Sequence, residues 1–195
     1  MSESEPNLLY SDIEQDLRAG VRELLAARCP WQSVLGRVEN DAAEITDLAL
    51  WRELAAMGVA GLPTAATWRQ RWVVAEELGR AAAPVPFLGS AVLATSALAS
   101  VDGDEQARSL LADLAEGRRT ATLAVPLSTA PGGAFPALVR VEDRTLTGTV
   151  PGVVDALNAD VLVVAATGAD GPGLYLVPAD EAVRAPVVSL DLTRP

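Results

Sequence analysis

The chain has 195 residues, half of them apolar, and a formal net charge of −11 from 26 acidic and 15 basic residues. This length accommodates one large domain or two small ones, and the apolar content is that of a globular protein. The acidic balance argues against nucleic acid or an anionic membrane as the main partner.

Missing residue types exclude most self-contained catalytic machinery. The sequence has no His and no Lys, so all 15 basic residues are Arg. These absences rule out Ser–His and Cys–His nucleophile systems, an HExxH zinc site, a Walker A loop and a Schiff-base lysine. The single cysteine, Cys29, is expected to be a small buried apolar residue, and no metal site is expected.

The sequence shows no targeting or membrane segment. Its N-terminus is acidic and polar, unlike the basic start of a signal peptide. The longest largely apolar stretch, 87–101, carries several hydroxyl residues and is too short to span a bilayer. These features predict a cytoplasmic protein.

Up to about residue 119 the apolar residues recur at helical spacing. A first helix is expected to begin at a capping box of Ser11 and Glu14, to carry the apolar stripe from Ile13 to Leu25, and to end at Pro30. Further helices are expected at about 45–57, 67–82, 86–100 and 105–115, with Asp104 as the N-cap of the last.

After Arg119 the pattern changes to short strand-like runs between turn residues. Candidate strands are 120–125, 137–141, 145–149, 161–166, 173–177 and 187–190. We therefore expect an α+β protein, with a helical domain at 1–119 and a small antiparallel β-barrel or sandwich domain at 120–195. The last run has no closing element after it, so a further segment or another chain is expected to cover that edge.

Several segments, taken in order, resemble the acyl-CoA dehydrogenase family. In the helical half these are Leu50-Trp51-Arg52-Glu53-Leu54-Ala55-Ala56-Met57-Gly58, Gly61-Leu62-Pro63, and Val74-Ala75-Glu76-Glu77-Leu78-Gly79-Arg80-Ala81 with Ala83-Pro84-Val85-Pro86. In the β half they are Leu146-Thr147-Gly148 with Asp155-Ala156 and Ala159-Asp160, then Gly173-Leu174-Tyr175-Leu176-Val177 and Leu190-Asp191-Leu192-Thr193-Arg194. Together they span about 10–195.

The resemblance implies a helical N-terminal domain, a middle β domain and a C-terminal helical bundle, the last being absent from this chain. It implies an FAD oxidoreductase acting on an acyl-CoA thioester, as in the degradation of fatty acids or steroid side chains. A Glu carboxylate removes the α-proton and FAD takes the β-hydride, a reaction that needs neither His nor Lys. The catalytic Glu lies in the family's C-terminal bundle, so the catalytic residue of this chain is unknown and the chain is expected to be inactive alone.

The resemblance also marks the positions of the flavin contacts, and the sequence departs from the family there. Leu123-Ala124-Val125-Pro126 stands where the family has Leu-Thr-Glu-Pro, which replaces a flavin-bonding Thr by Ala124. Ser128 and Thr129 are candidate substitutes, so the candidate cofactor-binding residues are Leu123, Ala124, Ser128 and Thr129. Gly152 and Val154 stand where an aromatic residue and a Thr usually contact the flavin ring.

Some bacterial members of the family work as two different chains that share one FAD. The departures favour such a partner chain here, active only in a hetero- or homo-oligomer with a second acyl-CoA dehydrogenase subunit or with itself. Three alternatives stay open: an ordinary subunit with a diverged loop, a non-catalytic subunit that docks on a flavin-bearing chain, and a CoA-thioester binding module without redox chemistry.

Three pairs of residues have both a structural and a functional interpretation. Glu76 and Glu77 point about 100° apart on a helix, so a solvated face, or one salt-bridged to Arg80, is favoured over shared acid–base chemistry. Trp68 with Trp72 is interpreted as core or inter-domain packing rather than the floor of an acyl pocket. Arg118-Arg119 is interpreted as a solvated loop rather than a contact to a CoA phosphate.

Overall fold

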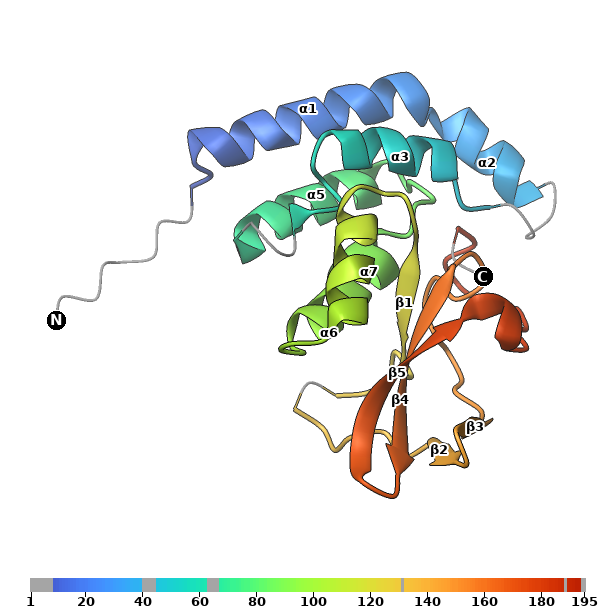
Figure 1. The fold of residues 1–195 in the computed structure, drawn as a ribbon. Helices are drawn as coiled ribbons and strands as arrows, with labels where there is room; N and C mark the ends of the chain where they lie inside the picture. Colours follow the sequence, from blue (N-terminus) through green and yellow to red (C-terminus); the bar gives the residue numbers. More distant parts are fainter. Residues whose placement is uncertain (1–8, 40–44, 63–66, 131, 188, 194–195) are drawn as a thin grey trace, which may run out of the picture.

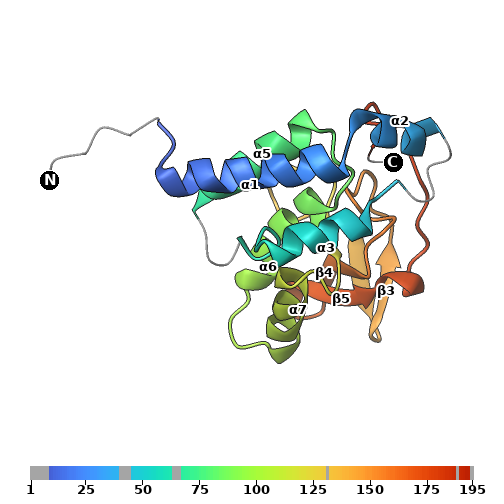
Figure 2. The ribbon, with the colours of Figure 1, turned by 90° about the horizontal axis from the view of Figure 1, so that it is seen from above.

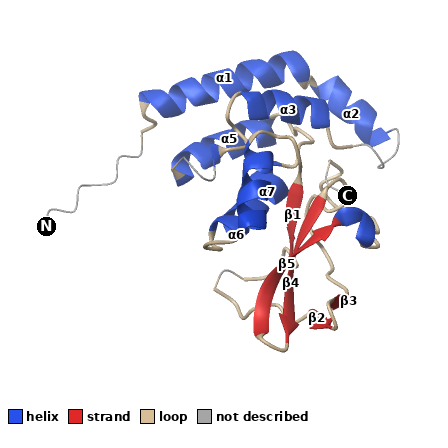
Figure 3. Cartoon of the chain, in the orientation of Figure 1, coloured by secondary structure: helices blue, strands red, loops and turns tan. Residues whose placement is uncertain are grey.

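The computed structural model describes residues 9–39, 45–62, 67–130, 132–187 and 189–193 (Figure 1). Helices form one half and strands the other, so the expected α+β class is confirmed (Figure 3). The helices are α1 (Asp12–Arg28), α2 (Trp31–Glu39), α3 (Leu48–Ala56), α5 (Trp68–Arg80), η2 (Phe87–Ala94), α6 (Thr95–Ala99), α7 (Glu105–Ala115) and η3 (Ala179–Glu181). The strands are β1 (Ala121–Ala124), β2 (Val139–Glu142), β3 (Thr145–Gly148), β4 (Val161–Gly168) and β5 (Gly171–Pro178).

Local capping signals place the helix starts where the sequence predicts them. In α1, Ser11 and Glu14 exchange hydrogen bonds between side chain and backbone, which confirms the capping box. The side chain of Asp104 accepts a hydrogen bond from the Ala107 amide at 2.8 Å and confirms that residue as the N-cap of α7.

Two helical expectations need correction. Helix α2 was not predicted, because a proline is typical of a helix end; the Pro30 carbonyl also accepts hydrogen bonds from the Ser33 and Val34 amides at the start of α2. The expected single helix at 86–100 is a π-helix, η2, followed by the short α6. Apolar periodicity does not distinguish a π-helix from an α-helix in this run, because nearly every position of it is apolar.

The sheet is mixed, whereas the sequence predicted an antiparallel one. β1 pairs with β4 in parallel, with Ala121 opposite Val161 and Ala124 opposite Val164. β4 pairs antiparallel with β5, and β2 pairs antiparallel with β3. A long connection separates β1 from β4 and allows the parallel arrangement, which a short hairpin cannot make. The strand expected at 187–190 is absent from its described residues, and residue 188 lies outside the described part.

Apolar packing joins the two halves of the molecule. One core lies within the helical half, around Trp51 and Leu54, both almost fully buried. A second core combines helix and strand residues, with Leu110 and Leu114 of α7 packed against Val161 and Val163 of β4. The helical half therefore supports the start of the sheet directly. Among the described helices none combines the length and apolar character that crossing a bilayer requires.

Candidate functional site

The four candidate cofactor-binding residues lie on β1 and on the loop after it. Ala124 is only 6% exposed and belongs to a core that also contains Leu162 and Val164 of the neighbouring strand. Leu123 is half-buried and packs on the opposite core, against α7 and β4. Ser128 and Thr129 are exposed, and neither hydroxyl makes a hydrogen bond within the described part of the chain. The four side chains therefore do not converge on one site.

The backbone of this loop is occupied by internal hydrogen bonds. The Val125 amide donates to the Leu123 carbonyl, and the Thr129 amide donates to the Pro126 carbonyl, both at 2.9 Å. The Leu127 amide donates across to the Gly152 carbonyl at 3.1 Å. Few donors of loop 125–129 remain for a ligand beyond the two exposed hydroxyls.

The second segment expected at the flavin, 148–155 with Gly152 and Val154, lies directly against the first. The Thr122 hydroxyl of β1, fully buried, donates to the Val154 carbonyl at 2.7 Å. Together with the bond between Leu127 and Gly152, this contact holds the two segments side by side. The structure thus brings together the positions expected at the flavin. The residues at these positions, Ala124, Gly152 and Val154, carry no polar side chain.

Comparison with known proteins identifies the family. The family model described as "Acyl-CoA dehydrogenase, N-terminal domain" matches residues 11–118. The chain belongs to the acyl-CoA dehydrogenase family. The match covers more than half of the chain, and it lies in the helical half, where the sequence resemblance also begins. No curated protein sequence matches this chain.

Solved structures of dehydrogenases extend the likeness into the β half. A chain of the "Tcur3481-Tcur3483 steroid ACAD G363A variant" is 31% identical, with a TM-score of 0.68 over 87% of this chain and 48% of that one. A chain of the ChsE4–ChsE5 complex from Mycobacterium tuberculosis is 26% identical, with a TM-score of 0.71 over 89% of this chain and 49% of that one. A glutaryl-CoA dehydrogenase from Mycobacterium smegmatis shares the fold at 20% identity, with a TM-score of 0.75 over 95% of this chain and 51% of that one.

This family member spans about half the length of those solved chains. Within the part that the structure describes, no group of three or more His, Cys, Asp or Glu residues is arranged to hold a metal ion.

The two tryptophans singled out by the sequence do not pack in a core. Trp68 and Trp72 of α5 are 68% and 73% exposed, so of the favoured interpretation, core or inter-domain packing, the core packing is wrong. The Arg71 guanidinium lies 4.3 Å from the centre of the Trp68 ring. The buried face of α5 carries Val73 and Val74, so the exposed rings of both tryptophans lie off that face.

The adjacent glutamates form a salt-bridged face, as expected, but with partners on another helix. The two oxygens of Glu77, a side chain only 2% exposed, accept hydrogen bonds from the Arg22 and Arg18 guanidiniums of α1 at 2.7–2.9 Å. Arg80, the partner suggested by sequence spacing, is more distant at 3.8 Å. Hydrogen bonds from Arg22, then from Arg18, lower the pKa of Glu77 from 4.5 to about 2 against the opposing effect of burial.

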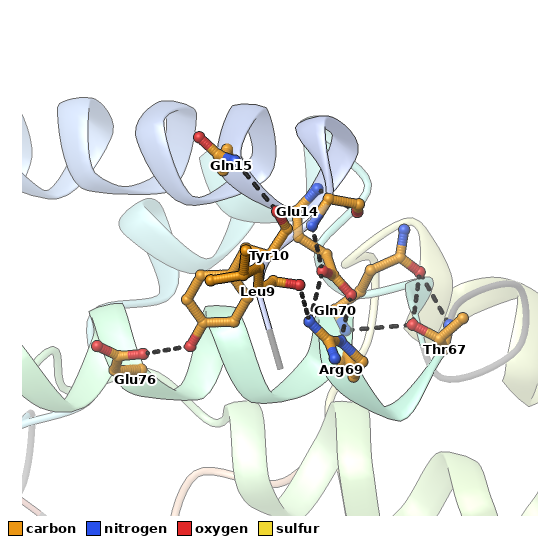
Figure 4. Close-up of polar contacts among 9 residues, drawn as sticks. Leu9, Tyr10, Glu14, Gln15, Thr67, Arg69, Gln70 and Glu76 are labelled. Carbon is orange, nitrogen blue, oxygen red and sulfur yellow. Dashed lines mark hydrogen bonds and ion pairs between the residues drawn. The ribbon is translucent and has the colours of Figure 1, made fainter. Parts of the chain in front are cut away.

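The same row of polar contacts continues to the start of α1, which lies beside α5 (Figures 2 and 4). Glu14 accepts hydrogen bonds from the Arg69 guanidinium at 2.9 and 3.1 Å, and these bonds lower the pKa of its carboxyl group. The Tyr10 hydroxyl donates to Glu76 at 3.1 Å. Arginines on the facing helix bind the Glu14 and Glu77 carboxylates and lower their pKa values, so this row of contacts joins α1 to α5 rather than serving as an acid–base pair.

The two arginines before β1 differ in their surroundings. Arg118 forms ion pairs with Asp113, at 2.7 Å, and with Glu116. Arg119 is exposed at the rim of an open hollow of about 360 Å³ between α7 and the strands β4 and β5. The expectation of a solvated loop is therefore confirmed for the exposed Arg119, and Arg118 is held by acidic neighbours.

Proposed function

We propose that this chain is a subunit of an acyl-CoA dehydrogenase that removes the α- and β-hydrogens of an acyl-CoA thioester. Its activity depends on assembly with a second chain, either a different dehydrogenase subunit or another copy. The chemistry that FAD would supply in such an assembly is acceptance of the β-hydride. Membership of the family and the likeness to chains of two-component complexes support this proposal.

One observation carries the dependence on a partner. The segments that would face the flavin carry Ala124, Gly152 and Val154, which have no polar side chains. The backbone amides of Val125 and Leu127 already donate hydrogen bonds to carbonyls of this chain. The hydroxyls of Ser128 and Thr129 are exposed and unpaired in the described part, but two hydroxyls do not make a complete flavin site. We infer that a partner chain holds FAD in the main and that this chain forms one wall of the site.

A second candidate function is a non-catalytic subunit that docks on a flavin-bearing chain. The burial of Ala124 within the sheet core favours it, since this position then offers the cofactor no polar group at all. In both proposals the chain works within an assembly, but they differ in whether flavin chemistry takes place next to its own loops.

The experiment is to purify the chain from its own host, alone and with the polypeptides that accompany it, and to quantify flavin per chain from the visible absorption spectrum. We expect a colourless isolated chain and a flavin-bearing assembly. Stoichiometric FAD on the isolated chain would overturn the dependence on a partner. Assemblies without flavin would favour the non-catalytic subunit, and thermal stabilisation by acyl-CoA alone would favour a thioester-binding module.

A variant of the loop shows whether this chain touches the flavin. Replacing Ser128 by Ala together with Thr129 by Val removes the two exposed hydroxyls without filling space. We expect the assembly to lose part of its flavin, whereas the matched control Thr147→Val, at an exposed position of β3, leaves the flavin content unchanged. Equal flavin content in both variants would contradict a flavin contact by this loop.

A further inference from the structure

The carboxylate of Asp155 ties the segment 148–155 to the helical half of the molecule. The Oδ2 atom of Asp155 accepts a hydrogen bond from the Gly89 amide at 2.8 Å. Gly89 is the third residue of η2, so its amide is among those that find no acceptor within the helix. A carboxylate at this end also interacts favourably with the helix dipole.

The backbone on both sides of this bond is specialised for it. Asp155 has a φ of +55°, a left-handed conformation that Asp and Asn adopt more readily than most residues. A Cβ atom added at Gly89 would lie 2.8 Å from the Asp155 Cβ and 3.0 Å from the Thr122 hydroxyl oxygen. Only glycine allows so close an approach, so the contact depends on both residues.

The bond lies next to the two contacts that define the candidate site. Thr122 holds the Val154 carbonyl, one residue before Asp155, and Leu127 holds the Gly152 carbonyl, three residues before it. These three anchors fix both ends of the segment from Gly152 to Asp155 against β1 and η2. Of the three, the one at Asp155 is charge-assisted and reaches the helical half.

We propose that Asp155 is a positioning residue that, through the Gly89 amide, fixes the segment Gly152–Val154 against the end of β1. This inference rests on the proposed function in one respect: the positioned segment forms the wall that the assembled dehydrogenase presents to its flavin. Asp155 itself is not catalytic, because its carboxylate is bonded to the helix end. Loss of the carboxylate frees the segment Gly152–Val154, and a larger residue in place of Gly89 pushes Asp155 away from η2.

The test compares Asp155→Ala, Asp155→Asn and Gly89→Ala in the full chain. A matched control is Asp143→Ala, because Asp143 is also a non-glycine residue with positive φ but lies in the exposed turn between β2 and β3. Amide hydrogen exchange of Gly89 and Leu127 reports on the anchors, and the flavin content and flavin absorption band of the co-purified assembly report on the wall.

We expect exchange at both amides to rise about tenfold or more in Asp155→Ala and in Gly89→Ala. Asp155→Asn keeps a carbonyl acceptor and restores most of the protection, whereas Asp143→Ala leaves both amides unchanged. Combining Asp155→Ala with Gly89→Ala adds little to either alone, since both remove the same contact. In the assembly, Asp155→Ala shifts the flavin band or lowers the flavin content, and Asp155→Asn does so less.

Unchanged exchange at Gly89 and Leu127 in Asp155→Ala would overturn the positioning role, whatever the flavin result. Faster exchange with an unaltered flavin band in a flavin-bearing assembly would overturn the link to the flavin wall while leaving the proposed function intact. If wild-type assemblies carry no flavin, the proposed function fails, and the exchange data alone decide whether Asp155 positions the segment.

Discussion

The ion pairs of Glu77 are expected to be the strongest single polar contribution to docking α1 on α5. The informative change is Glu77→Gln, which keeps the shape and one hydrogen-bond acceptor but removes the charge. The side chain is 2% exposed and lies between the Arg18 and Arg22 guanidiniums. Removing the charge takes the ion-pair partner at 2.7 Å from Arg22, whereas Arg18 keeps Glu76 as an acidic partner at 2.6 Å.

The magnitude follows from the pKa of Glu77, which is lowered from 4.5 to about 2 in the folded chain. At about 1.4 kcal/mol per pKa unit, the difference corresponds to roughly 3 kcal/mol in favour of the ionised carboxylate. Solvent reaches the partners, whose side chains are 27% and 53% exposed, and screening reduces this value. We expect Glu77→Gln to lower the free energy of unfolding by about 2 kcal/mol and the midpoint of thermal unfolding by roughly 4–8 °C.

Urea denaturation followed by circular dichroism measures this change, and Glu105→Gln is the matched control. Glu105 also pairs with an arginine, Arg108 at 2.6 Å, but its side chain is 83% exposed. We expect the control to unfold at the wild-type denaturant concentration. If Glu77→Gln also unfolds there, the assignment of a stabilising ion pair to Glu77 is wrong.

The pH dependence gives an independent check with a defined sign. Because the folded pKa of Glu77 lies below the unfolded value, its stabilisation is complete above about pH 4.5 and is lost as the pH falls toward 2. The difference in stability between wild type and Glu77→Gln should therefore be constant at neutral pH and vanish near pH 2. A difference that persists unchanged at pH 2 would show that the glutamine disturbs packing instead.

Three further predictions concern packing. Leu54→Ala, at a fully buried position of α3, should lower the free energy of unfolding by about 2–5 kcal/mol in urea denaturation; a loss below about 1 kcal/mol would contradict its place in the core. Trp72→Ala, at a side chain 73% exposed, should change it by less than about 0.5 kcal/mol in the same assay, and a larger loss would mean that the ring is packed. Burial raises the pKa of the Cys29 thiol, so a thiol reagent at pH 8 should label it slowly in the folded chain and rapidly in urea; equal rates would show that the thiol is open.

Sequence signals predicted the structure best where they are local. The Ser11–Glu14 and Asp104 caps lie within four residues of their partners, so their spacing alone specifies them. The Arg18–Glu77 contact joins residues far apart in the chain, and helix spacing suggested Arg80 in its place. The parallel pairing of β1 with β4 escaped prediction for the same reason, because nothing near Ala121 encodes Val161 as its neighbour.

The candidate site could be located by its resemblance to a family, but its chemistry could not be worked out from spacing. Residues 123–129 and 148–155 do lie together, through the bonds of Thr122 to Val154 and Leu127 to Gly152. The hydrogen bond from the Gly89 amide to Asp155 could not be predicted, because a glycine in an apolar run does not indicate contact with an aspartate 66 residues later.

Ala124, the residue that the family resemblance places at a flavin contact, is part of the apolar packing of the β half. Ala124 is 6% exposed among Val139, Leu162 and Val164, so a threonine hydroxyl placed there would enter apolar surroundings and displace neighbours. Restoring the family's threonine at this single position is therefore expected to destabilise the sheet without creating a flavin donor. If only one loop had diverged, Ala124→Thr would leave the stability of the chain unchanged; we expect the substitution to lower it.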